Sequence, residues 1–176
     1  MTTDAKKFNG IYKGAVVSNI DPNKVGRLLV RVQDVLGATP FWAEPATPLA
    51  GLSSGMYVVP LPNSGVWVSF VNGDPDRPVY TGFWRGGVGE VPAAASAAPP
   101  GTPQIVLGTP TQNYVVISDM PGPSGGILLQ LHGPAGPYIK LYEGGVEIGA
   151  SAAGPTIKVT PAGIDIGNGA LTVLGG

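Results

Sequence analysis

The acidic side chains and the single histidine are the residues of this sequence that could catalyse a reaction, and their positions argue against it. Two carboxylates act as general acid and base only where a cleft holds their pKa values apart. Asp74 and Asp76 lie in a turn-forming stretch, and Glu147 and Asp165 alternate with aliphatic residues, so all four should face solvent. His132 ends the strand-like stretch GILLQLH, where an exposed, capped histidine is the ordinary outcome. We therefore expect no catalytic residues.

Metal and cofactor sites are not expected either. The chain has no cysteine, which excludes disulfides and thiolate metal ligands. The glycine-rich stretch GGVGE lacks the Lys-Ser/Thr pair that completes a phosphate-binding loop. We expect no bound metal and no cofactor.

Aromatic residues offer one alternative function, the binding of single-stranded nucleic acid. Small barrels of the OB type bind such strands by stacking bases on aromatic rings over a basic groove. The aromatic residues available are Trp42, Tyr57, Trp67, Tyr80, Phe83 and Trp84. Basic residues among them are few, and the net charge of −1 gives no general attraction to phosphate. We expect the aromatic rings to fill the barrel or its contacts, and no nucleic acid to bind.

The composition indicates an all-β protein built from short strands. Only 12% of the 176 residues are charged, 43% are hydrophobic, and there are 28 glycines and 19 prolines. Dense turn formers within an apolar sequence are typical of short strands joined by tight turns. No stretch approaches the 18 consecutive apolar residues of a membrane span, and the N-terminus lacks the apolar core of a signal peptide. We expect a protein made in the cytoplasm.

The first half of the chain predicts a five-stranded OB-fold barrel over residues 11–86, after a polar lead-in at residues 1–10. Apolar and polar residues alternate with period two in GRLLVRVQD and GVWVSFVNG, as in half-buried strands. The strands are expected at 11–20, 26–34, 40–44, 55–60 with 65–71, and 78–84. Five short antiparallel strands in this length fit a small closed barrel.

A proline-rich turn precedes the last expected strand, and a spacer follows that strand. In the turn Gly73-Asp74-Pro75-Asp76-Arg77-Pro78, Pro75 fixes one turn position, Asp74 can cap it, and Pro78 keeps Arg77 extended. The sequence predicts a rigid hairpin tip there. Residues 87–112 are dominated by Ala, Pro and Gly and are predicted to be a linker between two domains.

The C-terminal part, residues 113–176, is a quasi-repeat of very short strands. Apolar–polar–apolar triplets separated by Gly-rich or Pro-Gly turns should each expose one polar side chain and turn two aliphatic ones inward. The expected inward residues are Ile139, Leu141, Val146, Ile148, Ile157, Val159, Ile164, Ile166, Leu171 and Val173.

A single chain folded this way would leave an apolar face and open sheet edges uncovered. Three chains around one axis would cover that face, and we expect strands of different chains to alternate along the ladder. Ten aliphatic residues at about 1.5–3 kcal/mol each give roughly 15–30 kcal/mol per chain before chain entropy. We therefore predict an intertwined trimeric β-helix, a β-prism. The alternative is a second small β-sandwich closed within one chain.

These features resemble a known family. VGRLLVRVQD, FWAEPATPLAG and GVWVSFVNGDPDRPVYTGFWRG resemble the OB-fold domain in the central spike of contractile injection machines, which include phage tails, pyocins and type VI secretion. The most specific part is the turn Gly73–Pro78 followed by Gly82, and the C-terminal repeats resemble the family's trimeric β-helix. The resemblance covers most of the chain and implies a membrane-piercing structural protein, with no enzymatic activity, that assembles in the bacterial cytoplasm.

Departures from the family refine its expected partners. The interval between barrel and repeats is too short for the lysozyme domain of some phage spikes, and only about ten residues precede the barrel. The resemblance thus implies a homotrimer seated on a separate hub protein. His132 is too far from the C-terminus for the His-x-His iron site of some spikes. The apolar end resembles spikes capped by a PAAR-type tip protein, with Leu171, Val173 and Leu174 as its platform. The spike would contact the target membrane only transiently. A receptor-binding or other static trimeric tail protein that does not pierce is the other alternative.

Overall fold

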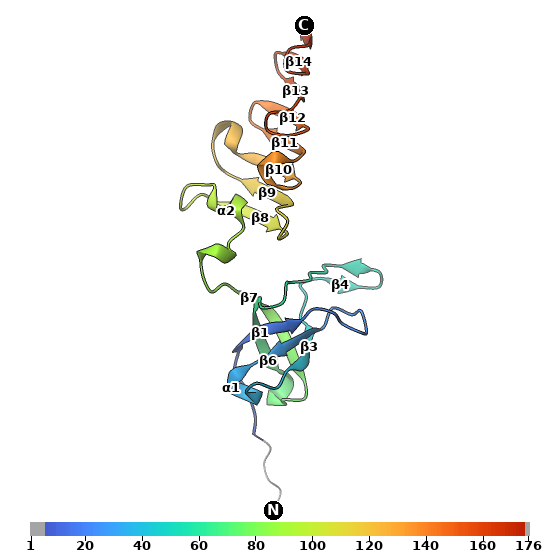
Figure 1. The fold of residues 1–176 in the computed structure, drawn as a ribbon, viewed down its shortest axis with the longest axis vertical. Helices are drawn as coiled ribbons and strands as arrows, with labels where there is room; N and C mark the ends of the chain where they lie inside the picture. The colour runs from blue at the N-terminus through green and yellow to red at the C-terminus, as the bar shows by residue number, and fades with distance from the viewer. Residues whose placement is uncertain (1–5, 175–176) are drawn as a thin grey trace, which may run out of the picture. The chain divides into compact units, whose positions relative to one another are not determined.

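The computed structural model describes residues 6–174. The chain divides between Val88 and Gly89 into two compact units, and each is described by itself. The first contains a barrel and the second contains one long sheet (Figure 1).

The N-terminal unit is a closed barrel of five strands, which confirms the predicted OB-type fold. Its strands are β1 (Tyr12–Ser18), β2 (Leu28–Arg31), β3 (Phe41–Pro45), β6 (Gly65–Phe70) and β7 (Pro78–Trp84), in the order β1-β2-β3-β7-β6. The alternating side chains of these strands fill the interior with Val16, Leu28, Val30, Ala43, Val66 and Val68. A parallel pairing of β3 with β7 closes the barrel, where only antiparallel pairs were expected.

Residues 55–60 differ from the expectation because they form no barrel strand. The chain there makes a ribbon of β4 (Ala50–Gly51) and β5 (Ser54–Gly55), followed by an exposed extended stretch. Pro60 and Pro62 lack the backbone N–H that a ladder position requires, so the next barrel strand begins only at Gly65. A short helix, α1 (Gln33–Leu36), follows β2.

One carboxylate organises the loop between β1 and β2. Asp21 accepts hydrogen bonds from the Arg27 guanidinium at 2.8 and 3.1 Å and from the backbone N–H groups of Asn23, Val25 and Arg27. The side-chain hydrogen bond from Arg27 is the main cause that holds the pKa of Asp21 well below its usual range, and the backbone donors add to it.

The polar lead-in contains a residue of the barrel core. Phe8 is buried against Phe70, with the two ring centroids 5.7 Å apart, and its backbone N–H donates to the carbonyl of Gly73 at 2.9 Å. The lead-in therefore lies against the turn that follows β6, in which η1 (Val71–Gly73) leads to Asp74.

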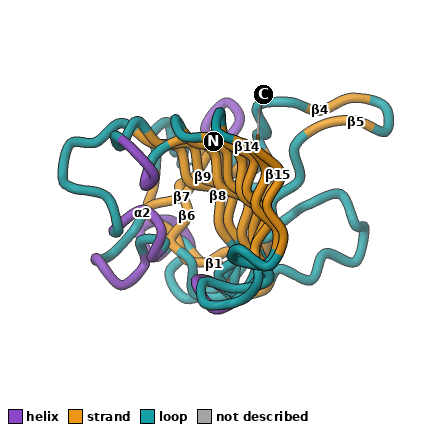
Figure 2. The backbone as a smooth tube through the Cα atoms, turned by 90° about the horizontal axis from the view of Figure 1, so that it is seen from above, coloured by secondary structure: helices purple, strands orange, loops and turns teal. Residues whose placement is uncertain are grey.

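The C-terminal unit is an eight-stranded antiparallel meander in which each strand pairs with its neighbours in sequence (Figure 2). The strands are β8 (Gln104–Gly108), β9 (Tyr114–Ser118), β10 (Gly126–Gln130), β11 (Tyr138–Tyr142), β12 (Gly145–Gly149), β13 (Thr156–Thr160), β14 (Gly163–Ile166) and β15 (Leu171–Leu174). Short helical segments lie before or between them: η2 (Val88–Glu90), α2 (Ala93–Ser96), η3 (Gly122–Ser124) and η4 (Gly133–Ala135).

Two expectations for this region need correction. The predicted linker at 87–112 contains β8 and α2, so the sheet begins earlier than the repeats suggested. The ladder also runs within one chain from β8 to β15, rather than alternating between chains, because each tight turn returns the chain beside the strand it has just left. The described part of the C-terminal unit contains no second sheet, which contradicts the alternative of a β-sandwich closed within one chain.

Candidate interaction face

The eight-stranded sheet carries two columns of aliphatic side chains on one face, with two residues from every strand. The register of each strand pair places these residues directly opposite one another. One column contains Ile105, Ile117, Ile127, Leu141, Val146, Val159, Ile164 and Val173, and the other contains Leu107, Val115, Leu129, Ile139, Ile148, Ile157, Ile166 and Leu171. We call these sixteen residues the aliphatic face.

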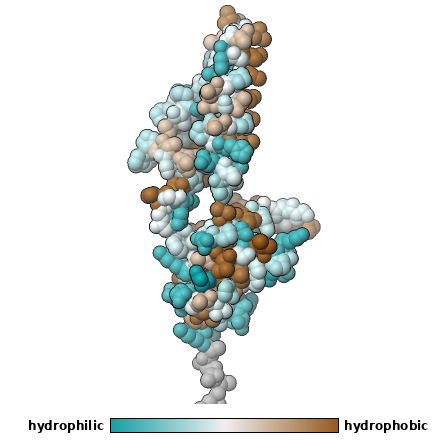
Figure 3. Space-filling view, viewed as in Figure 1, coloured by the Kyte–Doolittle hydropathy of each residue, from teal (hydrophilic) through white to brown (hydrophobic). Residues whose placement is uncertain are grey.

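The aliphatic face is uncovered in the single chain. All of its members except the half-buried Val146 are between 38% and 60% exposed. Figure 3 shows hydrophobic residues gathered along one side of the C-terminal unit. An apolar surface of this extent on a soluble domain marks an interaction site.

All ten residues that the sequence assigned to the inward face lie on the aliphatic face. The remaining members come from β8, β9 and β10, where sequence analysis assigned no inward residues: Ile105, Leu107, Val115, Ile117, Ile127 and Leu129. The same alternation was present in QIVL, NYVVIS and GILLQLH. The turns between these strands are longer and interrupt the seven-residue spacing. For that reason the sequence did not show that the pattern of inward residues continues into β8, β9 and β10.

The opposite face carries a column of alternating charges. Lys140 lies opposite Glu147, Glu147 opposite Lys158, and Lys158 opposite Asp165. The Lys158 Nζ and a Glu147 carboxylate oxygen are 3.8 Å apart. A one-residue slip of β11, β12, β13 or β14 would place a charge on the aliphatic face, so these residues help to fix the register.

Tyr138 adds a hydrogen bond to this charged column. Its hydroxyl donates to the Glu147 carboxylate, and its ring lies over Gly149 on the neighbouring strand, in the space that a side chain there would need. The hydrogen bond to Glu147 is the main cause that raises the pKa of Tyr138 to about 12. The pairing of an aromatic ring with a glycine across strands fixes their positions along the sheet.

The chain covers part of the charged side of the sheet itself. The Gln104 side chain donates to the Ala95 carbonyl in α2 at 2.8 Å, and Pro92 lies beside Gly108. Tyr114 and Val116, whose side chains point to this same side, are buried. The N-terminal segment of the unit therefore packs on one face and leaves the aliphatic face open.

The turn Gly73–Pro78 has the side-chain cap that the sequence predicts at Asp74. The Asp74 carboxylate accepts a hydrogen bond from the backbone N–H of Asp76 at 3.0 Å, and Arg77 N–H donates to the Asp74 carbonyl at 3.0 Å. Gly73 has φ of +74°, and a side chain there would collide with Asn9. Gly73 of this motif therefore lies against the lead-in of the same chain.

The three residues expected to form a tip platform lie on both faces of the last strand. Leu171 and Val173 continue the aliphatic face, whereas Leu174 lies opposite Gly163 on the other side of the sheet and is 80% exposed. β15 is the last strand of the described sheet, so one of its edges has no neighbouring strand there. The final two residues of the chain lie outside the described part.

The residues considered for chemistry are not assembled into a site. His132 is exposed at the end of β10, and its backbone N–H donates to Asn113 Oδ1 at 3.0 Å. Residues 6–174 contain no cluster of three or more His, Asp or Glu side chains that could hold a metal ion. Within the same residues, no helix has the length and apolarity to cross a membrane.

The aromatic residues lie in several environments, and three of them, Tyr57, Tyr80 and Phe83, line one hollow on the barrel. Tyr80 is buried in the barrel, and its hydroxyl donates to the Gly26 carbonyl at 2.7 Å. Lys13 Nζ lies between Trp67 and Trp84, at 5.7 and 4.9 Å from their ring centroids. Trp42 is paired with Arg27.

Comparison with known protein families assigns both units of the chain. Residues 12–84 match the model of the type VI secretion system and phage-baseplate injector OB domain. Residues 104–172 match the model of the phage baseplate V C-terminal trimerisation domain, and these limits include β8 and end within β15. No curated protein matches the chain in sequence.

Proposed function

Because the chain belongs to the phage baseplate V family of spike proteins, and carries its OB domain and its trimerisation domain in that order, we propose that it is the central, membrane-piercing spike of a contractile tail or injection particle. The observation that supports this function best is the aliphatic face. It is one continuous apolar surface, it lies in the matched trimerisation domain, and no described residue of its own unit covers it.

We propose that three copies bury their aliphatic faces against one another around a common axis. Fully burying an aliphatic side chain contributes about 1.5–3 kcal/mol. Since about half of each side chain is already covered, association of sixteen such residues would contribute roughly 12–24 kcal/mol per chain before entropy costs. A monomer gains none of this, so the stability of the unit would depend on trimerisation.

The same arrangement would make the unit stiff along its length. Adjacent strands are about 4.8 Å apart, so eight strands extend over about 34 Å, similar to the roughly 30 Å hydrocarbon core of a bilayer. Backbone hydrogen bonds between strands run along that direction. Three such ladders sharing one dry core would resist bending under an axial push. The protein itself would perform no reaction, and sheath contraction would supply the force.

Two partner proteins complete the proposed assembly: a trimeric hub that holds the barrels and a PAAR-type tip protein at the C-terminal end. The tip protein would meet the edge of β15, where Leu171, Val173 and Leu174 are exposed together with unpaired backbone groups. A chain truncated after Asn168 should fail to retain the tip protein in a pull-down. Retention by this truncated chain would refute the platform.

The decisive experiment is a measurement of molar mass in solution, followed by electron microscopy of particles. Light scattering should give three times the 17.8 kDa chain mass, unchanged on dilution. A folded species of one chain mass would contradict the proposal. In particles, one trimer should lie on the tube axis, and many copies away from that axis would indicate a tail protein that does not pierce.

A further inference from the structure

A second exposed apolar surface lies on the barrel, in a part of the chain without charge. From residue 45 to residue 73 the sequence contains no Asp, Glu, Lys, Arg or His. The β4–β5 ribbon and the stretch after it fall in this region. They expose Leu49, Leu52, Met56, Tyr57, Val58, Val59 and Leu61. No part of the aliphatic face contributes to this surface.

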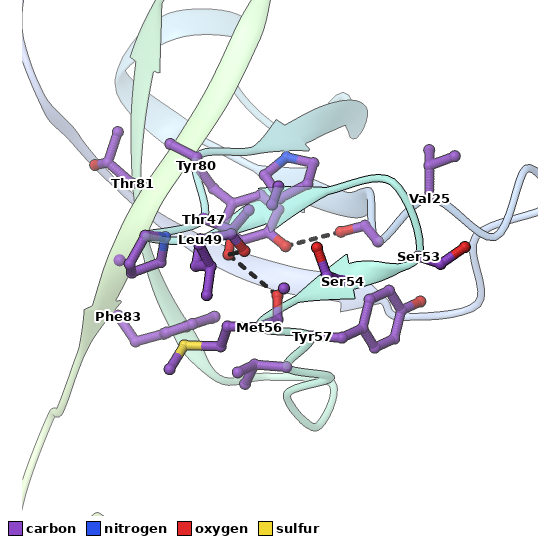
Figure 4. Close-up of a pocket in the computed structure, with 18 residues that line it drawn as sticks. Val25, Thr47, Leu49, Ser53, Ser54, Met56, Tyr57, Tyr80, Thr81 and Phe83 are labelled. Carbon is purple, nitrogen blue, oxygen red and sulfur yellow. Dashed lines mark hydrogen bonds between the residues drawn. The ribbon is translucent and has the colours of Figure 1, made fainter.

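The ribbon and the barrel wall enclose a hollow of about 790 Å³ (Figure 4). Val25, Met56, Tyr57 and Phe83 contribute apolar side chains to it, and no charged residue lines it. Tyr80 also lines it, but its hydroxyl already donates to the Gly26 carbonyl. The hollow therefore offers an uncharged, mainly apolar lining to an occupant.

The ribbon places an apolar side chain where its own chain gives it no cover. Each of its strands has only two residues, and the Thr47 hydroxyl fastens its base to the carbonyls of Leu49 and Met56 at 3.2 and 3.1 Å. At the tip, Leu52 is 99% exposed. A two-stranded ribbon of this size is not stable alone in water and needs a packing partner.

We propose that the ribbon is an intersubunit clasp, in which Leu52 of one copy packs into the hollow of a neighbouring copy's barrel. The proposal rests on the trimer proposed above. Each copy would donate one tip and accept one, and three such head-to-tail contacts close into a ring. Tip and hollow are both uncharged and apolar, so a second copy of this chain supplies a matching surface.

A contact of this small size is sufficient because the barrels are already tied together. Trimerisation through the sheet connects three barrels by the short segment 85–103, which raises their effective concentration toward the millimolar range. Burial of one leucine and part of the hollow would be too weak to join free barrels. The clasp is therefore expected only in the trimer.

Cysteine cross-linking tests the clasp directly, because the chain has no cysteine of its own. Full-length Leu52→Cys chains are co-expressed with Thr81→Cys chains, Thr81 being an exposed residue of the hollow. After the trimer mass is verified, a short bis-maleimide should yield a covalent dimer of twice the 17.8 kDa chain mass. The matched control replaces Leu52→Cys with Leu36→Cys, an exposed leucine of α1 that does not line the hollow.

The outcomes separate the clasp from the trimer. A dimer yield at least fivefold above the Leu36→Cys control supports the clasp. A yield equal to the control overturns it while the verified trimer stands. In a chain that carries both Leu52→Cys and Thr81→Cys, cross-linking only within single chains also overturns it, because the ribbon would then close on its own barrel. Protection of Leu52→Cys from maleimide by lipid vesicles, but not by trimerisation, would assign the ribbon to a membrane instead.

A stability measurement gives an independent test. Leu52→Ser should lower the melting temperature of the barrel in the trimer by several degrees, and should leave it unchanged in a chain made monomeric by Ile164→Asp. An equal change in both backgrounds would mean that Leu52 acts within its own chain, and would overturn the clasp.

Discussion

Replacing Ile164 with aspartate should abolish trimer formation while the barrel stays folded. Ile164 is the next-to-last member of one aliphatic column, lies opposite Val159 and Val173, and is 38% exposed in the single chain. A threefold axis would bring three copies of the new carboxylate together in a dry core.

The size of the effect follows from burial. Loss of the remaining isoleucine burial costs about 0.6–1.1 kcal/mol per chain, which is 38% of about 1.5–3 kcal/mol. Each desolvated carboxylate adds several kcal/mol, so three of them cost on the order of 10 kcal/mol per trimer. At 1.4 kcal/mol per factor of ten, the association constant should fall by about seven orders of magnitude.

Analytical ultracentrifugation at micromolar concentration should detect this loss as a change from trimer to monomer. Lowering the pH to about 4 should restore part of the trimer, because burial and mutual repulsion raise the carboxyl pKa values and favour the neutral form. Leu174→Asp is the matched control: it also replaces an exposed aliphatic residue with a charge, but on the opposite side of the sheet. Ile164→Val should cost only about 0.5–1.5 kcal/mol.

The result that would refute this reasoning is a soluble Ile164→Asp trimer with an unchanged melting temperature. The aliphatic face would then not be buried in the assembly, and the proposed core would be wrong. Loss of the trimer to the same degree in Leu174→Asp would also refute the reasoning, because trimer formation would then depend on both sides of the sheet.

Three further predictions concern charged and titrating groups. Lys158→Glu should destabilise the sheet by about 1 kcal/mol through repulsion with Glu147 and Asp165, whereas Lys158→Gln should lower the melting temperature less; equal losses would mean that repulsion across the strands is not the cause. Asp21→Asn should flatten the acid limb of a stability–pH curve. Arg27 holds the pKa of Asp21 below its ordinary value of 3.8, so the ionised carboxylate stabilises the fold above pH 3.8, and this stabilisation is lost as the pH falls below that value. Tyr138→Phe should flatten the alkaline limb. The hydrogen bond to Glu147 raises the pKa of Tyr138 from 10.0 to about 12, so the neutral hydroxyl stabilises the fold below pH 10, and this stabilisation is lost as the pH rises through 12. Unchanged limbs in denaturant titrations at several pH values would contradict both assignments.

Much of the aliphatic face was predictable from the sequence because it depends on local periodicity. Side chains alternate across a strand, so triplets such as Ile157-Lys158-Val159 assign each residue to one of two faces before any strand is paired. The turn Gly73–Pro78 was predictable for a similar reason: proline and glycine restrict φ within a few residues. A mistake of one residue would have exchanged the two faces, and none occurred for the ten predicted residues.

What the tertiary structure decided was which segments pair and which remain outside a sheet. The apolar stretch at 56–61 has strand-like composition, but it lies outside the barrel because Pro60 and the following Pro62 cannot donate a ladder hydrogen bond. QIVL looks like part of a linker, but it pairs with β9. Phe8 joins the barrel core from a polar segment through a contact with Phe70, which is distant in sequence. Local sequence determines the direction of each side chain, whereas pairing depends on hydrogen bonds and burial between distant segments. Those contacts exist only once the chain has folded.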